Sequence, residues 1–563
     1  MAARRKHKKI DRTGVLPRQL TRIVKLLAFL LCLFAPIRLV NALGNEGCAD
    51  FFGALEGCFV LFSLFGIGTN RAVSNLIRTR IERYGITGAK KIAGQALLTA
   101  FFVSVVLALF GAALKDVLFC TFYALPFAKM AFLALLCAFV ILTLFWMLLG
   151  ILDAFGRRET AGRWILVFGV LLFFAAPLIA APFDAYGQKV GALLQNTSYQ
   201  AAYGALGAAF SVLCVSLLCT AGCGISWIKA SHELHQAEYG SSTNPAADRS
   251  IAFFLFRNGL VICVPAALAG IGRIGQSSIY LKSGSVSTWG AYLGKYRLLM
   301  TLALLGAFAL AASLLPQFQL VLNRRSLRKS REKCMVAFRC TALYTITCAV
   351  LFLTTAQPML HMLFSKGELN DLYSILKVLA ITVIFYGLAF MLGSVLFAAE
   401  LYYSIWIAVL VSVLVRLVSF SVMSSALKLD LYAGAYSDAL SAFVLCLILL
   451  GMVRQQLKIA VNWLRVFLAP LLAGILMALV CLLCSQVILK NAASPVRMLV
   501  SAVVGLLVYF VSTVVLKGAT RRELRCFAAG DVLIELASIE DEYGNTPAQR
   551  AELDWLLYNK PLE

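Results

Sequence analysis

The chain contains 563 residues, of which 61% are hydrophobic and only 14% are charged. A soluble domain has about 25% charged and about 45–50% apolar residues, so this composition excludes a disordered chain, a disulfide-rich secreted scaffold and a water-soluble enzyme. The apolar stretches are far longer than the roughly 10 residues of a tilted membrane strand, which excludes a transmembrane β-barrel. The sequence therefore predicts an all-α polytopic membrane protein.

A transmembrane helix needs roughly 20 apolar residues to cross the hydrocarbon. Fourteen stretches of the sequence approach or exceed this length, and an even number agrees with both ends of the chain lying on one side of the membrane. The predicted spans are residues 26–43, 51–68, 92–114, 130–151, 164–182, 200–222, 251–279, 298–322, 334–355, 372–398, 405–427, 436–453, 463–487 and 496–516.

The basic residues give the orientation of these spans. The net charge is +24, and the cations gather in residues 1–22, 71–91 and 324–333, whereas residues 44–50 contain none. This alternation follows the positive-inside rule and predicts a cytoplasmic-membrane protein with both termini in the cytoplasm. The surplus also favours anionic membrane lipids as partners, while no basic face interleaved with aromatic residues indicates nucleic acid.

The longest polar segment between spans follows the sixth span and suggests two bundles of six helices. Such a 6+6 arrangement is typical of transporters built from two related halves, with the substrate path between them. The predicted organisation is a basic cytoplasmic N-terminus (1–25), an N-terminal bundle (26–227), a cytoplasmic linker (228–250), a C-terminal bundle (251–453), two additional spans (454–516) and a cytoplasmic amphipathic tail (517–563).

Arginines inside the predicted spans are the strongest candidates for a functional role, because ionisable groups at membrane depth usually face a cavity or a partner. Arg416 is the deepest, since 11 residues from either end of 405–427 correspond to roughly 16 Å. Guanidinium groups bind two phosphate oxygens at once and stay charged. We therefore predict substrate-binding roles for Arg38, Arg257, Arg273 and Arg416. The alternatives are an internal salt bridge or carbonyl cap for Arg416 and snorkelling to the interface for the other three.

Glu56 is the acidic candidate, lying beside Gly53 and Gly57 in the second predicted span. It is predicted either as a counter-ion to Arg38 or as a coupling site for Na⁺ or H⁺, and structural pairing is the alternative. Further polar groups inside the spans could contact sugars, but no spacing selects any of them; they are Asn258, Tyr344, Gln357 and Tyr386. The sequence has no phosphate-binding P-loop, which argues against a primary pump. No catalytic residue, metal site or cofactor other than a coupling ion is predicted.

Four blocks of the sequence resemble the MOP (MATE-like) exporter superfamily. They are residues 37–85, which begin IRLVNALGNEGCADFF, residues 257–284 (RNGLVICVPAALAGIGRIGQSSIYLKSG), residues 314–333 (LLPQFQLVLNRRSLRKSREK) and residues 375–420, which end IWIAVLVSVLVRLVSF. They resemble the family's opening helix and glycine-containing turn, its seventh span with a proline, its eighth-span exit into a basic loop, and its tenth and eleventh spans. Arg416 occupies the place where a basic residue recurs in the eleventh span. The resemblance covers the predicted spans from residue 26 to residue 516.

Fourteen spans and internal arginines are most similar to the polysaccharide-exporter and lipid II flippase branch, which includes stage V sporulation protein B. The resemblance implies a MATE-like fold of two six-helix bundles plus two C-terminal helices. It also implies a non-enzymatic flippase that moves a polyprenyl-pyrophosphate-linked saccharide or cell-wall precursor outward by alternating access. Its partners are then the lipid-linked saccharide and proteins of cell-envelope synthesis.

Two other functions stay open from the sequence. A cation-coupled multidrug antiporter of the same fold needs acids in its cavity, and the predicted spans contain few acids. A non-catalytic membrane partner of a polysaccharide synthesis complex is the second alternative. A membrane enzyme is not favoured, because no cluster of acids or histidines stands in a predicted outer loop.

Overall fold

The structure is a computed structural model, and it describes residues 15–236, 251–282, 284–323, 327–364, 370–458, 463–489 and 493–516. The regular secondary structure of these residues is entirely helical, which confirms the predicted all-α class. The predicted basic N-terminus up to residue 14, the linker residues 237–250 and the predicted tail 517–563 lie outside the described residues.

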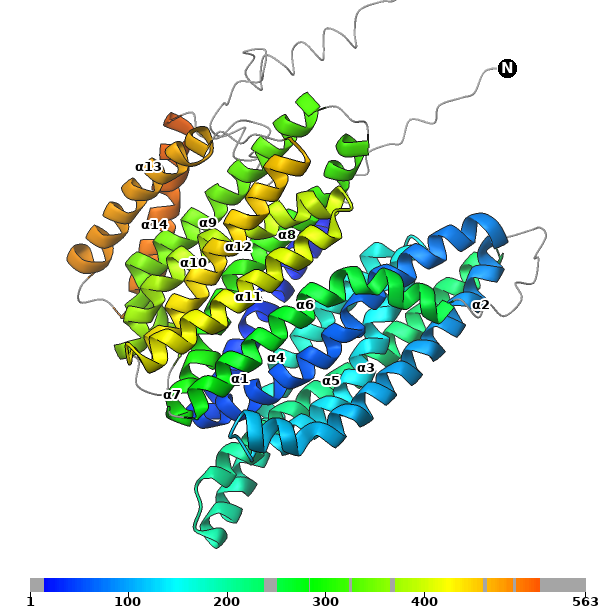
Figure 1. The fold of residues 1–563 in the computed structure, drawn as a ribbon, viewed down its shortest axis with the longest axis horizontal. Coiled ribbons are helices and arrows are strands. Elements are labelled where there is room, and N and C mark those ends of the chain that lie inside the picture. The colour runs from blue at the N-terminus through cyan, green and yellow to red at the C-terminus, as the bar shows by residue number, and fades with distance from the viewer. Residues whose placement is uncertain are drawn as a thin grey trace, which may run out of the picture. The chain divides into compact units, whose positions relative to one another are not determined.

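The chain divides into two compact units, Met1–Gly270 (unit 1) and Ile271–Glu563 (unit 2), and the boundary falls inside helix α6. Figure 1 shows both units as bundles of long helices. The helices of unit 1 are α1 (Val15–Leu64), α2 (Gly66–Asp116), the π-helix η2 (Val117–Phe122), α3 (Ala128–Ala154), α4 (Arg158–Leu194), α5 (Ser198–Gln236) and the first part of α6 (Ile251–Leu281).

Unit 2 contains the end of α6 and the rest of the helices. These are α7 (Val286–Ala291), the π-helix η3 (Tyr292–Arg297), α8 (Leu298–Asn323), α9 (Leu327–Leu363), α10 (Asn370–Ala398), α11 (Tyr402–Ser425), α12 (Leu431–Gln456), α13 (Trp463–Leu482), the π-helix η4 (Leu483–Ile488) and α14 (Ser494–Val515).

Unit 1 is held together by apolar packing between α2, α3 and α5. Val73 and Ile77 of α2 pack in one cluster with Met147 and Ile151 of α3, and all four are fully buried. A side chain at Gly150 would lie only 2.4 Å from the carbonyl oxygen of Asn70, so this close approach of α3 to α2 requires glycine.

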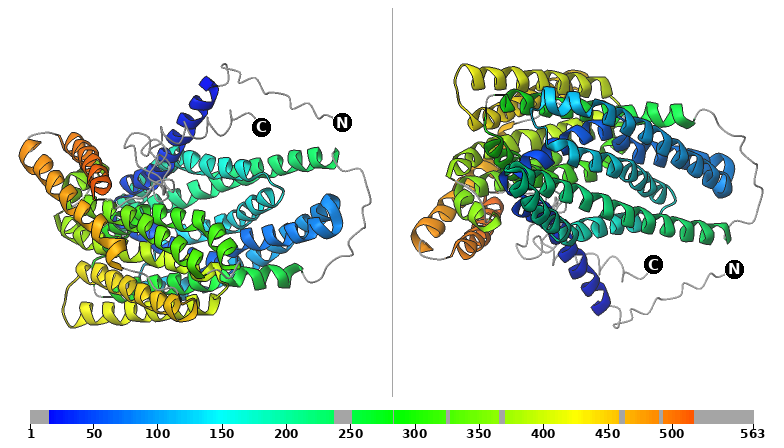
Figure 2. Two further views of the ribbon diagram at one scale, coloured as in Figure 1. Left: turned by 90° about the horizontal axis from the view of Figure 1, so that it is seen from above. Right: turned by 90° about the horizontal axis from the view of Figure 1, so that it is seen from below.

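The C-terminal pair α13 and α14 packs on α9 at the edge of unit 2 (Figures 1 and 2). Met477 and Cys481 of α13 join the apolar core that α9 forms with α8 and α10. The hydroxyl of Tyr509 on α14 donates a hydrogen bond to the carbonyl oxygen of Leu343, at 3.1 Å. The two additional helices are therefore part of the core of unit 2.

Thirteen helices in the described part of the chain are long and apolar enough to cross a membrane. One of these segments, Leu27–Ile81, contains 55 residues and joins most of α1 to the first part of α2. It includes nearly all of two predicted spans, 26–43 and 51–68. A continuous helix of that length would measure about 80 Å, against about 30 Å of hydrocarbon. Gly44 interrupts it with φ 69° and ψ −176°, a conformation that only glycine adopts readily. The break at Gly44 separates the two predicted spans.

Several helices extend beyond the ends of their predicted spans. The helix resumes directly after Gly44 and includes residues that were predicted as an outer loop. The helix that contains span 298–322 continues backward through η3 and α7 to Val286, and α12 begins at Leu431 instead of residue 436. These extensions place additional charged residues inside the helical bundles.

Candidate functional site: buried charges in the two units

Six charged side chains are buried among the described residues, and they are distributed unevenly. Unit 1 buries two acids, Asp50 and Glu56, whereas unit 2 buries three cations and one acid, namely Lys295, Arg297, Arg416 and Asp438. Moving a charged group from water into the protein interior costs roughly several kcal/mol, unless a partner offsets the lost hydration. These residues are therefore the candidates for function within the described chain.

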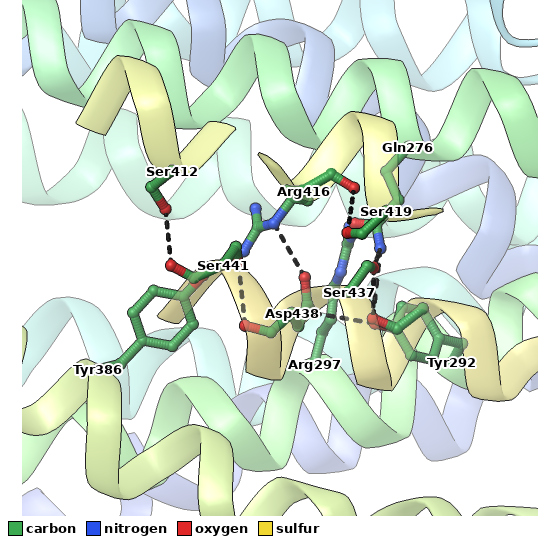
Figure 3. A network of polar contacts seen from close by, with 11 residues as sticks. Gln276, Tyr292, Arg297, Tyr386, Ser412, Arg416, Ser419, Ser437, Asp438 and Ser441 are labelled. Atoms are coloured by element: carbon green, nitrogen blue, oxygen red, sulfur yellow. Dashed lines mark hydrogen bonds and ion pairs between the residues drawn. The ribbon is translucent and has the colours of Figure 1, made fainter. Parts of the chain in front are cut away.

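The centre of the unit 2 group is an ion pair between Arg416 on α11 and Asp438 on α12. The Nε atom of Arg416 lies 3.0 Å from Oδ1 of Asp438, and the two side chains are 9% and 1% exposed. Neither atom makes a hydrogen bond with the described residues, so the contact is a pairing of charges. Arg416 also donates a hydrogen bond from its terminal nitrogen to the hydroxyl of Tyr386 on α10 (Figure 3).

Hydroxyl groups surround this pair. The hydroxyl of Tyr292 donates to Oδ2 of Asp438 at 2.9 Å, and the hydroxyls of Tyr386 and Ser441 lie 3.0 Å apart. Ser441 also donates to the backbone carbonyl of Asp438 at 2.9 Å. We refer to Arg416, Asp438, Tyr292, Tyr386 and Ser441 as the Arg416 cluster. Its members come from η3, α10, α11 and α12, so the cluster connects these elements inside unit 2.

Gln276 joins α6 to the same region. Its amide donates to the hydroxyl of Ser437 at 3.0 Å and accepts a hydrogen bond from Arg297. The guanidinium carbon of Arg297 lies 5.3 Å from the ring centroid of Tyr292 and 5.6 Å from that of Trp289. A cation over an aromatic face is attracted by the ring quadrupole. Arg297 thus contacts the amide of Gln276 on α6 and the rings of Trp289 on α7 and Tyr292 on η3.

An aromatic column continues from these rings. Tyr280, Trp289, Tyr292 and Tyr296 stack in order, with centroid separations of 4.5, 4.8 and 4.8 Å. Two members of the column, Tyr292 and Tyr296, belong to the π-helix η3, which also carries the buried Lys295. Single-turn π-helices occur frequently at functional sites, because the wider turn redirects side chains.

The acids of unit 1 lie in the second half of α1. Glu56 accepts a hydrogen bond from the hydroxyl of Tyr123 at 3.3 Å. Asp50 is only 5% exposed, and no hydrogen bond or ion pair to it is found among the described residues. A buried carboxylate in this condition favours a neutral, protonated form or a bound cation. Asp50 and Glu56 are thus the two buried acids of unit 1, and Glu56 differs from Asp50 in having a hydrogen-bond partner.

The structure places the four predicted arginines in both units. Arg38 and Arg257 are exposed residues of unit 1, and the guanidinium carbon of Arg38 lies 4.7 Å from the ring centroid of Phe173. Arg273 is half-buried in the unit 2 part of α6, and Arg416 is buried in the internal salt bridge described above. That salt bridge is the alternative that the sequence left open for Arg416. A cavity shared by all four arginines stays a prediction.

Sequence reasoning missed most of the buried charges. Asp50, Lys295, Arg297 and Asp438 stand at or just outside the predicted span ends, where the hydropathy falls. A usable signal was present at Asp438, because Ser437 and Ser441 flank it in a run of small residues that favours close helix packing. Within the described residues, no group of three or more His, Cys, Asp or Glu side chains has the arrangement of a metal site.

Comparisons with known proteins bear on the fold. An inward-closed structure of the lipid II flippase MurJ matches with a TM-score of 0.61 and 16% identity, covering 88% of this chain and 98% of the flippase. An inward-facing multidrug MATE transporter of the MOP superfamily matches with a TM-score of 0.60 and 17% identity, covering 76% of this chain and 94% of that transporter. The chain has the MOP-superfamily fold. This result confirms the predicted MATE-like architecture.

A third MOP-superfamily structure, a transporter from Pyrococcus furiosus, matches with a TM-score of 0.53 and 17% identity, covering 79% of this chain and 94% of that one. Its description states that a reversed polarity of the binding pocket suggests a different function. Residues 520–563 match a family of unknown function, DUF6061, and lie outside the described residues. No curated protein sequence matches the chain.

Proposed function

We propose that this protein is a transporter that moves a polyprenyl-pyrophosphate-linked saccharide or cell-wall precursor outward across the cytoplasmic membrane by alternating access. The observation that carries the proposal is the basic interior of unit 2, where three buried cations accompany one buried acid. An interior with this polarity suits a diphosphate, because guanidinium and ammonium groups offset the charge of phosphate oxygens at low dielectric. The same interior repels cationic drugs.

The extent of the structural likeness supports the flippase branch. The match to the lipid II flippase covers more of this chain than the match to the multidrug MATE transporter, and the difference is close to the length of 454–516. That segment contains α13 and α14, which pack on α9. We assign the prenyl tail to a groove beside these two helices. The basic N-terminus and the basic loops are assigned to contacts with anionic lipids, and both termini to the cytoplasm.

We assign the pyrophosphate contacts during the transport cycle to Arg38, Arg257 and Arg273. Each of these guanidiniums is exposed or half-buried, whereas that of Arg416 is enclosed by Asp438 and Tyr386. Arg416 then contributes to the basic interior through its charge and holds unit 2 together. Glu56, together with Asp50, is assigned to a coupling ion, Na⁺ or H⁺. Proteins of cell-envelope synthesis are proposed as partners that supply or use the cargo.

One observation favours a second function, a cation-coupled multidrug antiporter. Asp50 and Glu56 are buried acids on one helix of unit 1, and Asp50 has no partner among the described residues. A lipophilic cation could use these carboxylates as its counter-ions. The two functions differ in the charge of the cargo, so they can be separated experimentally.

The test is transbilayer movement of a fluorescent short-chain polyprenyl-pyrophosphate saccharide in proteoliposomes. Losing a charged hydrogen bond to phosphate costs about 1.5–3 kcal/mol, which corresponds to a roughly 10-fold or greater reduction in rate. We expect this reduction for Arg38→Ala and for Arg273→Ala. Arg454→Ala, which removes an exposed arginine at the end of α12, serves as the matched control and should transport normally. Normal transport by both test variants would remove these arginines from the cargo site.

A further inference from the structure

We propose that Arg416 acts as a resident cation of unit 2. The guanidinium of Arg416 occupies an oxygen-lined cation site. Without this side chain, the site would bind a dissociable cation such as Na⁺ or free guanidinium. The proposal concerns the folded state of unit 2 and does not depend on the identity of the cargo, so it can fail or hold independently of the proposed function.

The first argument is the chemistry of the groups around the guanidinium. Oδ1 of Asp438 lies 3.0 Å from Nε of Arg416, and the hydroxyl of Tyr386 accepts a hydrogen bond from the same guanidinium. The Ser441 hydroxyl lies 3.0 Å beyond that of Tyr386 (Figure 3). Carboxylate and hydroxyl oxygens are the ligands that hard cations take in proteins. The site around Arg416 is thus built from groups that bind cations.

The second argument is the burial of the carboxylate. Asp438 is 1% exposed, and its other oxygen is occupied by the hydroxyl of Tyr292 at 2.9 Å. Hydroxyl groups stabilise a buried carboxylate but do not neutralise it, so an ionised Asp438 requires a positive charge beside it. Among the described residues, Arg416 is the cation that forms an ion pair with Asp438. The protein supplies the required cation on its own side chain.

The third argument is the position of the site among the helices. The Arg416 cluster draws on η3, α10, α11 and α12, and Gln276 extends the network to α6 through Ser437. A cation at this point holds several helices of unit 2 in one arrangement. Because the cation is covalently attached, its occupancy does not change with the ion concentration on either side of the membrane. If the transporter uses a coupling ion, the buried acids of unit 1 are then the groups available to bind it.

The test uses the full-length protein in detergent and measures its thermal unfolding midpoint, Tm. Arg416→Ala leaves the Asp438 carboxylate buried without its cation and should lower Tm by about 5 °C or more. Adding low concentrations of guanidinium chloride should restore at least half of this loss in the variant. The same ionic strength of choline chloride, whose cation is too large for the site, should restore none of it. Recovery with NaCl would also support a cation site.

Two further variants keep the outcome decisive. Arg416→Ala combined with Asp438→Asn removes both charges, so it should have a higher Tm than Arg416→Ala alone and no response to guanidinium. Arg454→Ala should behave like the wild type in every salt. If Arg416→Ala does not fold, the double variant must still fold for the proposal to stand.

Three results would overturn the proposal. The first is a folded Arg416→Ala variant whose Tm responds equally to guanidinium, sodium and choline. The second is a double variant that is no more stable than Arg416→Ala. The third is a sodium-specific rise in the Tm of the wild type that Asp438→Asn abolishes, because a dissociable cation would then use the site while Arg416 is present.

Discussion

In unit 1 the buried charges are two acids on one helix, whereas in unit 2 three buried cations accompany a single acid. The acids also differ in their surroundings. Asp50 has no partner among the described residues, while Asp438 is paired with Arg416 and hydrogen-bonded to Tyr292. A carboxylate without a fixed partner can exchange protons or ions, and a carboxylate in a closed network cannot do so without disturbing the bundle. The comparison shows that unit 2 fixes its buried acid in a network of charged and hydroxyl groups, whereas unit 1 leaves Asp50 outside any such network of the described residues.

The largest effect is expected for Asp438→Asn in unit 2. Removing this acid leaves the guanidinium of Arg416 buried without compensation, which should lower the free energy of unfolding by about 3–5 kcal/mol. Chemical unfolding of the purified protein in detergent measures the change. Asp116→Asn, which removes one partner of an exposed ion pair with Lys129, is the control and should leave the free energy of unfolding nearly unchanged, because solvent screens the exposed pair. Equal losses in the two variants would contradict the closed network.

A smaller effect is expected for the tyrosines that contact the buried acids. Tyr292→Phe removes a 2.9 Å hydrogen bond to Asp438 and should cost about 1.5–3 kcal/mol, the range for hydrogen bonds to charged groups. Tyr123→Phe removes a 3.3 Å hydrogen bond to Glu56 and should cost less. The same unfolding measurement compares them. A larger cost for Tyr123→Phe would show that unit 1 holds its acid as firmly as unit 2 does.

The backbone break in unit 1 gives the next prediction. Gly44→Ala should lower the free energy of unfolding by about 1–3 kcal/mol, because the backbone conformation at this position is strained for any other residue. The added methyl group meets no atom within 4 Å, so the cost comes from the backbone alone. Gly94→Ala is the matched control, since it also meets no atom but has a helical backbone, and it should be neutral or stabilising by about 1 kcal/mol. Similar effects at both glycines would contradict a required break at Gly44.

The smallest effect on stability is expected for Asp50→Asn. An amide of the same shape removes the cost of burying a charge and leaves no described partner unpaired, so stability should change by less than about 1 kcal/mol or rise slightly. Thermal unfolding in the same detergent measures this change beside that of Asp438→Asn. A loss as large as that of Asp438→Asn would show that Asp50 is also part of a closed network.

The fold was largely predictable from the sequence, because an apolar stretch long enough to cross the hydrocarbon has few alternatives to a helix. The predicted span 298–322 agrees closely with α8, Leu298–Asn323. The predicted linker begins at residue 228, whereas α5 continues to Gln236. Helices continue past the last apolar residue wherever the following side chains can reach water or a partner, and hydropathy does not register such continuations.

The candidate site was only partly predictable, for the same physical reason. Arg416 and Glu56 stand within apolar stretches and were identified as costly buried charges. Asp438 stands near the start of the predicted span 436–453 and was not singled out, but α12 begins at Leu431 and brings Asp438 beside Arg416. Which acid pairs with which arginine depends on the packing of α11 against α12, and a single sequence does not contain that information.

The central claim is that this protein carries an anionic lipid across the membrane, and one measurement tests it most directly. Proteoliposomes containing the wild-type protein can be loaded in parallel with a fluorescent polyprenyl-pyrophosphate saccharide and with a fluorescent lipophilic cation, and the movement of each across the bilayer can be compared with protein-free liposomes. We predict protein-dependent movement of the pyrophosphate lipid and none of the cation. Protein-dependent movement of the cation alone would contradict the account and favour the multidrug antiporter.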